Sequence, residues 1–219
     1  MSFDKTEALK VLNKVKELGG ELIAVSKKFS LSDIKKAHQI GVSDFGENYV
    51  EEALAKIAEV PNCTETFRWH FIGKIQSNNI NKMIDKFEVI HSLYKFKHIK
   101  KFNKGSKKTQ KILIQIRHEK DSRENGVFFK DLESLLLEVK DLPMINLKGL
   151  MFMPPEEFSK KELEFSFADI KKKFNQLKIK SDKNDWDMIS MGMSSDFEMA
   201  LEMGATHVRI GTAIFGSRT

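Results

Sequence analysis

Short apolar runs bounded by polar residues recur along the chain and predict buried β-strands. Eight runs have this form: residues 22–26, 44–47, 67–72, 89–93, 111–117, 147–153, 187–191 and 207–211. The first five begin 22 or 23 residues apart. A β-hairpin needs far less chain, whereas one strand, one helix and two short loops fill such an interval.

Amphipathic stretches lie between these runs and predict helices. Leu31, Ile34, Ala37 and Ile40 recur in three-residue steps, and Gly41 stands where a helix C-cap belongs. Similar spacing marks residues 50–58 and 132–139, and residues 6–18 form a helix before the first strand. The longest predicted helix covers residues 158–178, with three side chains facing the core: Phe165, Ile170 and Phe174.

Regular alternation of strand and helix predicts crossover connections and a parallel sheet. Eight such units favour one domain over residues 1–219, a single (β/α)8 TIM barrel with an extra N-terminal helix. An open doubly wound sheet is the alternative. It would carry a glycine-rich turn after the first strand, but residues 26–30 contain no glycine.

Composition supports a folded protein with a substantial core. Hydrophobic residues make up 41% of the chain and charged residues 31%, and the 17 Phe argue against disorder. Cys63 is the single cysteine, which excludes an intramolecular disulfide and a four-cysteine zinc site. A reducing cytoplasm is therefore the expected location.

The net charge of +6 arises from short lysine patches that are interleaved with acidic or apolar residues. Such patches are typical of solvated helix faces, so we expect no nucleic-acid partner. No apolar run approaches the roughly 20 residues that span a membrane, so no membrane partner is expected. The first 17 residues carry acids and lysines without an apolar core, so they do not predict a signal peptide.

Lys27 is the strongest candidate for a reactive residue, because it lies at the end of a predicted strand and TIM-barrel sites lie at the C-terminal ends of the strands. It follows the apolar run 22–25, and strand alternation places it on one face with Ile23 and Val25. A partly buried ammonium has a lowered pKa and can form a Schiff base with a carbonyl group. The alternative is an ordinary surface lysine just beyond the strand.

The last two predicted units suggest a phosphate site. Residues 190–194 and 211–212 each join a strand to a helix through glycine and a hydroxyl residue, an arrangement that can bind an anion. Plain turns with helix caps would explain Ser194 and Thr212 equally well. Arg209, on the inward face, could meet a ligand or pair with Glu47. A lysine and a phosphate-binding site at the same end of the barrel suit a ligand with both an aldehyde and a phosphate group, such as pyridoxal 5'-phosphate.

Several motifs, in order, resemble the pyridoxal phosphate homeostasis proteins, the YggS/PROSC family. The resemblance extends over about residues 5–218 and rests on segments 24–27, 45–50, 69–73, 76–78, 149–151, 190–196 and 209–216. It implies a barrel like the N-terminal domain of alanine racemase, with pyridoxal phosphate as cofactor. No metal is expected, because the six histidines show no metal-ligand spacing and none partners Cys63.

The resemblance also implies roles for individual residues. Lys27 would carry the cofactor covalently, and Asn48 would lie beside its ring. Ser190 and Ser194, with the backbone of Gly211 and Thr212, would hold the phosphate. Arg209 would face the pyridine nitrogen. Because arginine keeps its proton, the ring nitrogen would stay unprotonated, and carbanion chemistry would be disfavoured.

This chain departs from the family pattern at three positions. Asn79 stands where many members have a lysine, Glu124 precedes Gly126 where another lysine is common, and Lys28 directly follows Lys27. A second lysine that stores or relays the cofactor is therefore not predicted.

Two classes of function remain open from the sequence. The resemblance favours a carrier that takes part in vitamin B6 homeostasis without turnover and passes its cofactor to apo-enzymes. Because the barrel uses the full chain, we expect a monomer. The alternative is an amino-acid racemase, which needs a base on each face of the substrate. Lys27 could serve one face, and Tyr49 is the candidate for the other.

Overall fold

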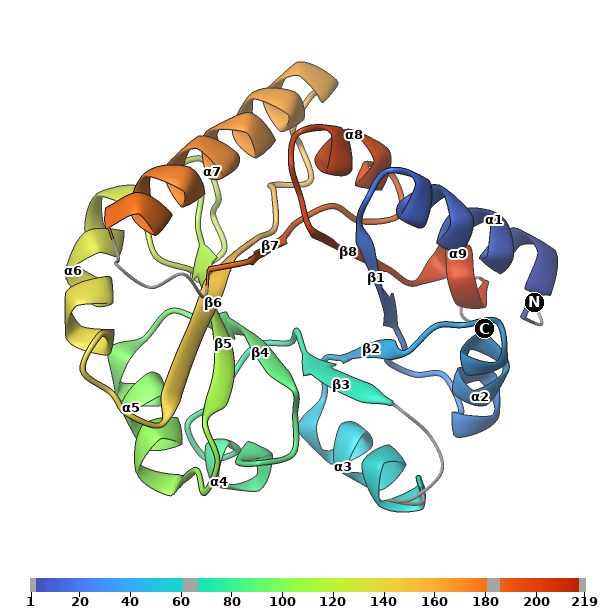
Figure 1. The fold of residues 1–219 in the computed structure, drawn as a ribbon, viewed down its shortest axis with the longest axis horizontal. Coiled ribbons are helices and arrows are strands. Elements are labelled where there is room, and N and C mark those ends of the chain that lie inside the picture. Colours follow the sequence, from blue (N-terminus) through green and yellow to red (C-terminus); the bar gives the residue numbers. More distant parts are fainter. Residues whose placement is uncertain (1–2, 61–66, 181–185, 217–219) are drawn as a thin grey trace.

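A computed structural model describes residues 3–60, 67–180 and 186–216, so Cys63 lies outside the described residues. Eight parallel strands form a closed barrel in sequence order (Figure 1). They are β1 (Glu21–Val25), β2 (Asp44–Glu47), β3 (Arg68–Phe71), β4 (Val89–Leu93), β5 (Gln110–Ile116), β6 (Ile145–Phe152), β7 (Met188–Ser190) and β8 (His207–Ile210).

Helices surround the barrel and follow its strands around the ring (Figure 1). They are α1 (Lys5–Glu17), α2 (Leu31–Gln39), α3 (Val50–Glu59), α4 (Ile80–Met83), α5 (Phe96–Gly105), α6 (Phe129–Val139), α7 (Lys160–Lys180), α8 (Phe197–Glu202) and α9 (Thr212–Phe215). The added helix α1 packs against α9, which brings the first and last helices together.

The predicted (β/α)8 barrel is confirmed, and the open-sheet alternative is wrong. Closure comes from pairing of the first and last strands, in which Ile23 is in register with Arg209. On its other edge β1 pairs with β2, with Ile23 opposite Asp44. Residues far apart in sequence are therefore neighbours at the same level of the barrel.

Most of the core lies between the strands and the helices, where large side chains such as Phe45, Phe71 and Phe102 are fully buried. A second, smaller apolar cluster fills part of the barrel interior and consists of Val89, Leu113, Met151, Met188 and Met153. The predicted end of α2 is also confirmed, since Gly41 has a φ of 98° directly after the C-cap Ile40.

Two details of the helical predictions are wrong. Phe165 does not face the core but is 74% exposed, because α7 buries Phe167, Ile170 and Phe174 and residue 165 lies on the opposite side of that helix. In α3 the predicted inward residue Ala58 is exposed, while Lys56 is buried on the same face as Ala53. The face towards the barrel therefore includes a cation.

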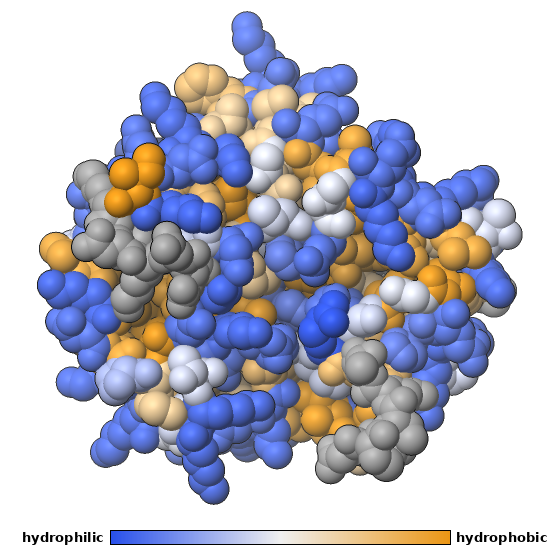
Figure 2. Space-filling view, in the orientation of Figure 1, coloured by the Kyte–Doolittle hydropathy of each residue, from blue (hydrophilic) through white to orange (hydrophobic). Residues whose placement is uncertain are grey.

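Figure 2 shows hydrophilic side chains gathered around the middle of the face that it presents, with hydrophobic groups scattered farther out. Within the described ranges, none of the helices combines the length and the apolar composition that crossing a membrane requires.

Candidate functional site

Three of the predicted site residues lie on adjacent strands at one end of the barrel. Arg209 is on β8, Lys27 follows β1 and Asn48 follows β2, and these strands are neighbours in the sheet. Lys27 and Asn48 are half-buried, whereas Arg209 is buried. The closed topology therefore places an amine, an amide and a guanidinium on or directly after three consecutive strands, and their contact with one ligand stays a prediction.

The turn that carries Lys27 is fixed by its backbone. Lys28 has a left-handed φ of 66°, which is unusual for a residue other than glycine. Its N–H donates to Oε1 of Glu52 at 2.5 Å, and the N–H of Phe29 donates to the carbonyl of Ser26 at 3.1 Å. These contacts hold the residues on both sides of Lys27.

A buried ion pair lies behind this turn. Nζ of Lys56 donates to Oε1 of Glu47 and to Oε1 of Glu52, both at 2.7 Å, and to the carbonyl of Ser26 at 2.8 Å. The Ser26 hydroxyl donates to Glu47 as well. Burial raises the pKa of Glu47 despite these bonds. Glu47 thus pairs with Lys56 and not with Arg209, which corrects one of the alternatives for Arg209.

The Glu47–Lys56 pair could have been predicted from the periodicity of the sequence. Asp44 faces the barrel interior, and Glu47 is three residues later, so strand alternation turns it outward, towards the helices. Lys56 continues the three-residue steps of the buried face of α3, after Val50 and Ala53. The two charges consequently meet between the sheet and α3.

Asn48 is held by close backbone packing. A Cβ at Gly73 would lie 2.1 Å from the Asn48 carbonyl oxygen, so only glycine fits there. The hydroxyl of Ser92 donates to the Gly73 carbonyl. The side-chain Oδ1 of Asn48 is buried and has no hydrogen-bond partner among the described residues. A buried acceptor of this kind is costly unless a ligand supplies a donor.

Arg209 is anchored by two hydrogen bonds. Nη1 donates to the Ser190 hydroxyl at 2.7 Å, and Nη2 donates to the Phe152 carbonyl at 2.9 Å. Burial lowers the pKa of Arg209 to about 10, partly offset by the charge of Asp196. The guanidinium therefore still carries its proton at neutral pH, in agreement with the sequence-based argument.

The four residues predicted to bind phosphate occupy different environments. Ser190 is fully buried, and its hydroxyl contacts both Arg209 and His91. Ser194 and Thr212 are exposed at the ends of two neighbouring turns, and Gly211 is buried directly before α9. Their contact with phosphate stays a prediction.

The turn between β7 and α8 is closely packed. Gly192 has a φ of 92°, and a Cβ there would lie 2.6 Å from the Cβ of Ala200. The backbone N–H of Met193 donates to Oδ1 of Asp196 at 2.6 Å. In α9 the N–H groups of Ile214 and Phe215 donate to the Gly211 carbonyl, so the first N–H groups of that helix have no acceptor within it.

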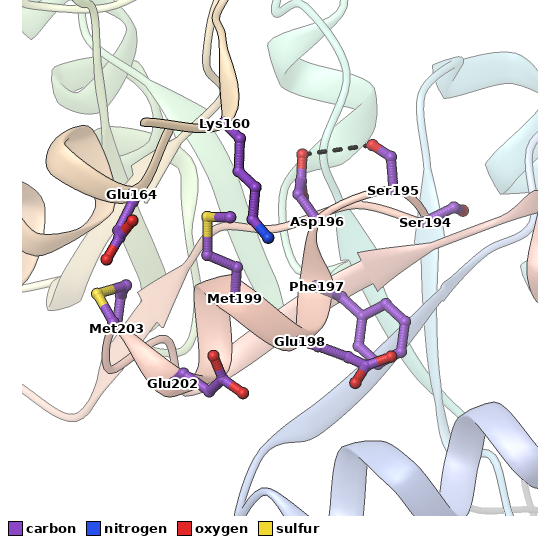
Figure 3. A pocket seen from close by; sticks show the side chains of 10 residues that line it. All are labelled: Lys160, Glu164, Ser194, Ser195, Asp196, Phe197, Glu198, Met199, Glu202 and Met203. Carbon is purple, nitrogen blue, oxygen red and sulfur yellow. Dashed lines mark hydrogen bonds between the residues drawn. The ribbon is translucent and has the colours of Figure 1, made fainter. Parts of the chain in front are cut away.

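A pocket beside this turn is unsuited to an anion. Its lining includes Glu164, Asp196, Glu198 and Glu202, with Lys160 as the only cation. Figure 3 shows Ser194 at the edge of this pocket, with its hydroxyl pointing away from the acidic side chains. The side of the turn away from this pocket is electrostatically better for a phosphate group.

Two histidines near strand ends take part in a polar chain that the sequence did not predict. His70 on β3 and His91 on β4 are buried and contact each other, with Nδ1 of His70 2.9 Å from Nε2 of His91. The interpretation of these histidines as packed, hydrogen-bonded residues agrees with these contacts. Within the ranges that the structure describes, no three His, Cys, Asp or Glu side chains are grouped so that they could hold a metal ion.

The opposite end of the barrel is lined by charged side chains that pair with each other. Arg68 donates to both carboxylate oxygens of Asp44, Lys148 lies 2.8 Å from Asp187, and Lys111 contacts Glu88. These six residues and His207 border one polar cavity of about 360 Å³. Burial lowers the pKa of His207 to about 4.

The donor set at the C-terminal mouth fits pyridoxal phosphate. Lys27 supplies an amine for an aldehyde, and exposed hydroxyl and backbone N–H groups can meet an anion. The unpartnered Oδ1 of Asn48 and the buried guanidinium of Arg209 supply an acceptor and a permanent cation.

Comparisons with known proteins give the same picture. Residues 7–219 match the model of the family described as alanine racemase, N-terminal domain. The Pyridoxal phosphate homeostasis protein of Pseudomonas aeruginosa is 36% identical over 200 residues, covering 90% of this chain and 84% of that one. The Escherichia coli protein of the same name is 33% identical over 208 residues, covering 90% and 85%.

Solved structures agree on the fold. PipY of Synechococcus elongatus with bound PLP superposes with a TM-score of 0.87 at 30% identity, covering 95% of this chain and 100% of that one. Alanine racemase of Corynebacterium glutamicum has a TM-score of 0.76 at 14% identity, and 61% of its chain is covered. This protein therefore belongs to the pyridoxal phosphate homeostasis protein family and has the barrel of the alanine racemase N-terminal domain.

Proposed function

We propose that this protein binds pyridoxal 5'-phosphate covalently at Lys27 and takes part in keeping the cellular supply of that cofactor in balance. The observation that carries the proposal is the convergence of Lys27, Asn48 and Arg209 on three adjacent strands, with Oδ1 of Asn48 buried and unpartnered within the described part of the chain. Relatives that are named for this role and the PLP-bound PipY structure support it.

Each residue has a distinct task in this proposal. Lys27 supplies the attacking amine, and the turn held by Lys28 and Glu52 presents it at the mouth. Asn48 accepts a hydrogen bond beside the cofactor ring. Arg209 places a permanent cation opposite the ring nitrogen. When bound, the cofactor supplies an aldehyde for amines and an electron-withdrawing ring.

The phosphate group is assigned to the two turns at the ends of β7 and β8. Ser194 and Thr212 are exposed, so the hydroxyl of Ser194 and the backbone N–H groups of Gly211 and Thr212 at the start of α9 are the proposed donors. Ser190 lies in the same region, but its side chain is engaged with His91 and Arg209, so its contribution is through Arg209.

The carrier role predicts storage and transfer without turnover. Because Arg209 keeps its proton, the ring nitrogen stays unprotonated and the ring is a weaker electron sink, so bound amino acids should not exchange their α-hydrogen. We also propose that the protein is a monomer and that apo-enzymes that use this cofactor are its transient acceptors.

The test combines three measurements on the purified, cofactor-loaded protein. Visible absorbance that is fixed by borohydride reports the covalent bond, and activation of an apo-enzyme reports transfer. NMR of L-alanine in deuterated water reports exchange at the α-carbon. Exchange no faster than free cofactor gives supports the carrier. Rapid exchange with inversion, lost in Lys27→Ala and strongly reduced in Tyr49→Phe, would establish a racemase instead.

A further inference from the structure

Five polar side chains form a continuous chain of hydrogen bonds across the interior of the barrel. Nη1 of Arg209 lies 2.7 Å from Oγ of Ser190, which lies 3.1 Å from Nδ1 of His91. Nε2 of His91 is 2.9 Å from Nδ1 of His70, and Nε2 of His70 is 2.9 Å from Oδ1 of Asp44. All five residues are at most 6% exposed.

With both imidazoles neutral, the carboxylate end of this chain fixes the direction of every bond within it. A guanidinium can only donate and a carboxylate can only accept, whereas serine and neutral histidine can each do both. We infer that hydrogen-bond donation runs one way from Arg209 to Asp44, which holds His91 and His70 in the Nε2–H tautomer and makes Ser190 and His91 positioning residues for Arg209.

The direction follows step by step. Asp44 can only accept, so His70 carries its proton on Nε2 and offers Nδ1 as an acceptor. His91 therefore donates from Nε2 to His70, which leaves Nδ1 of His91 to accept from Ser190. Ser190 gives its single proton to His91 and accepts from Arg209.

The electrostatics of the interior favour a neutral His91. Burial lowers the pKa of His91 well below its usual value, and the nearby charge of Arg209 acts in the same direction. At the other end of the chain, the carboxylate of Asp44 is also bonded by Arg68 through both oxygens.

The chain accounts for the placement of Arg209. Its bonds to Ser190 and Phe152 use two of the five N–H groups of the guanidinium and set the plane of the group. They also commit the proton of Ser190 to His91, so Ser190 acts on the cofactor through Arg209. Only this last step, the action on the cofactor, rests on the proposed function.

The tautomers can be measured without any cofactor. We would label the histidines with ¹⁵N, assign His70 and His91 through His70→Gln and His91→Gln, and record long-range ¹H–¹⁵N spectra of the apo-protein at pH 7. The expected result is a proton on Nε2 alone in both rings. A proton on Nδ1 of either ring, or on both nitrogens, would overturn the inference.

Asp44→Asn tests the end of the chain. An asparagine amide can donate as well as accept, so His70 should acquire a population with its proton on Nδ1. Glu88→Gln is the matched control, because Glu88 borders the same cavity without joining the chain. Tautomers unchanged in Asp44→Asn would show that the carboxylate does not set the direction. If this variant does not fold, the wild-type spectra decide the question alone.

Ser190→Ala tests the positioning role in the loaded protein. Loss of the hydroxyl should shift the visible absorption maximum of the bound cofactor, and Ser190→Thr should restore it. An unshifted maximum in Ser190→Ala would refute the positioning role. Absence of any bound cofactor in the wild-type protein would instead refute the proposed function, while the tautomer result would stand.

Discussion

The polar side chains at the two ends of the barrel differ in how far they are paired within the protein. At the N-terminal end, Arg68, Lys111 and Lys148 each lie against a carboxylate. At the C-terminal end, the hydroxyls of Ser194 and Thr212 are exposed, and a buried oxygen of Asn48 has no partner among the described residues. Both ends are polar, but the three cations at the N-terminal end are paired with carboxylates, whereas the Asn48 oxygen at the C-terminal end is bonded to none of the described residues.

This difference indicates that the N-terminal end of the barrel contributes to stability and the C-terminal mouth to ligand binding. Charges that pair with each other are already satisfied and leave little for a ligand to gain. Unsatisfied groups cost folding free energy, and a ligand that satisfies them recovers that cost as binding energy. Substitutions at the N-terminal end should therefore change the free energy of unfolding, and substitutions at the C-terminal mouth should change ligand retention.

The largest effect is expected at Lys27. Lys27→Ala should abolish borohydride-fixed label, because Lys27 directly follows β1, the strand that pairs with β2, which Asn48 follows, and with β8, which carries Arg209. Peptide mapping by mass spectrometry measures the label, with Lys74→Ala as the control at another exposed lysine. The free energy of unfolding should change by no more than about 0.5 kcal/mol. Label recovered on Lys28 or Lys74 would contradict the assignment.

Lys56→Met is expected to be an exception to this division, because Lys56 lies near the ligand end of the barrel but should affect the free energy of unfolding. Lys56 lies behind the Lys27 turn and neutralises the buried Glu47, so its removal leaves an uncompensated carboxylate. Breaking a buried ion pair costs about 3–5 kcal/mol, which urea unfolding would measure. The double variant Glu47→Gln with Lys56→Met should regain part of this loss. A single variant as stable as the wild type would show that the pair contributes nothing.

His207 should make the N-terminal end sensitive to acid. Because burial lowers the folded-state pKa of His207 to about 4, protonation favours the unfolded chain, whose histidines titrate near 6.5. Stability present above pH 6.5 is lost as the pH falls towards 4, by up to about 3 kcal/mol from this residue. Unfolding free energies of His207→Gln between pH 7 and pH 4 should fall less steeply than those of the wild type. Parallel curves would refute the assignment.

Ser194→Ala tests whether a hydroxyl at the C-terminal mouth contributes to ligand retention. Loss of one charge-assisted hydrogen bond of about 1.5–3 kcal/mol should weaken retention of pyridoxal phosphate roughly tenfold or more. Retention of pyridoxal, which lacks the phosphate, should be unaffected in equilibrium dialysis. Ser195→Ala, one residue away and equally exposed, is the matched control. Equal losses for both ligands would place the phosphate elsewhere.

The smallest effect is expected for Glu88→Gln. Glu88 and Lys111 are both more than one-third exposed, and such pairs contribute about 0–1 kcal/mol. The variant should lose less than about 1 kcal/mol of unfolding free energy, and added salt should reduce the difference. A loss above about 2 kcal/mol, measured in urea at low salt, would mean that the whole ring of pairs acts as a unit.

The fold was accessible from the sequence because strand spacing and apolar periodicity are local signals. The interval of 22 or 23 residues between strand starts fixes the βα repeat, and Gly41 marks the end of α2. Phe165 was placed wrongly because its own hydrophobicity favoured burial. The inner face of α7 is set by Phe167, Ile170 and Phe174, which fill the space against the barrel.

The candidate site was accessible only in part. Lys27, Asn48 and Arg209 follow from strand ends and from the family resemblance, because each lies at a predictable position on its own strand. The chain through Ser190, His91, His70 and Asp44 joins strands whose relative heights depend on the tilt and stagger of the closed barrel. No local pattern in the sequence contains that information.

Pairing of β1 with β8 has a consequence for the order of events during synthesis. The candidate site combines Lys27 from the start of the chain with Arg209 and Gly211 from near its end, and Ile23 is in register with Arg209. A ribosome therefore has to deliver the chain as far as Gly211 before the mouth can exist. Barrel closure is a contact of very high sequence separation, which slows folding. Cofactor loading consequently has to follow the synthesis of β8, and shorter nascent chains do not compete for the free cofactor through this site.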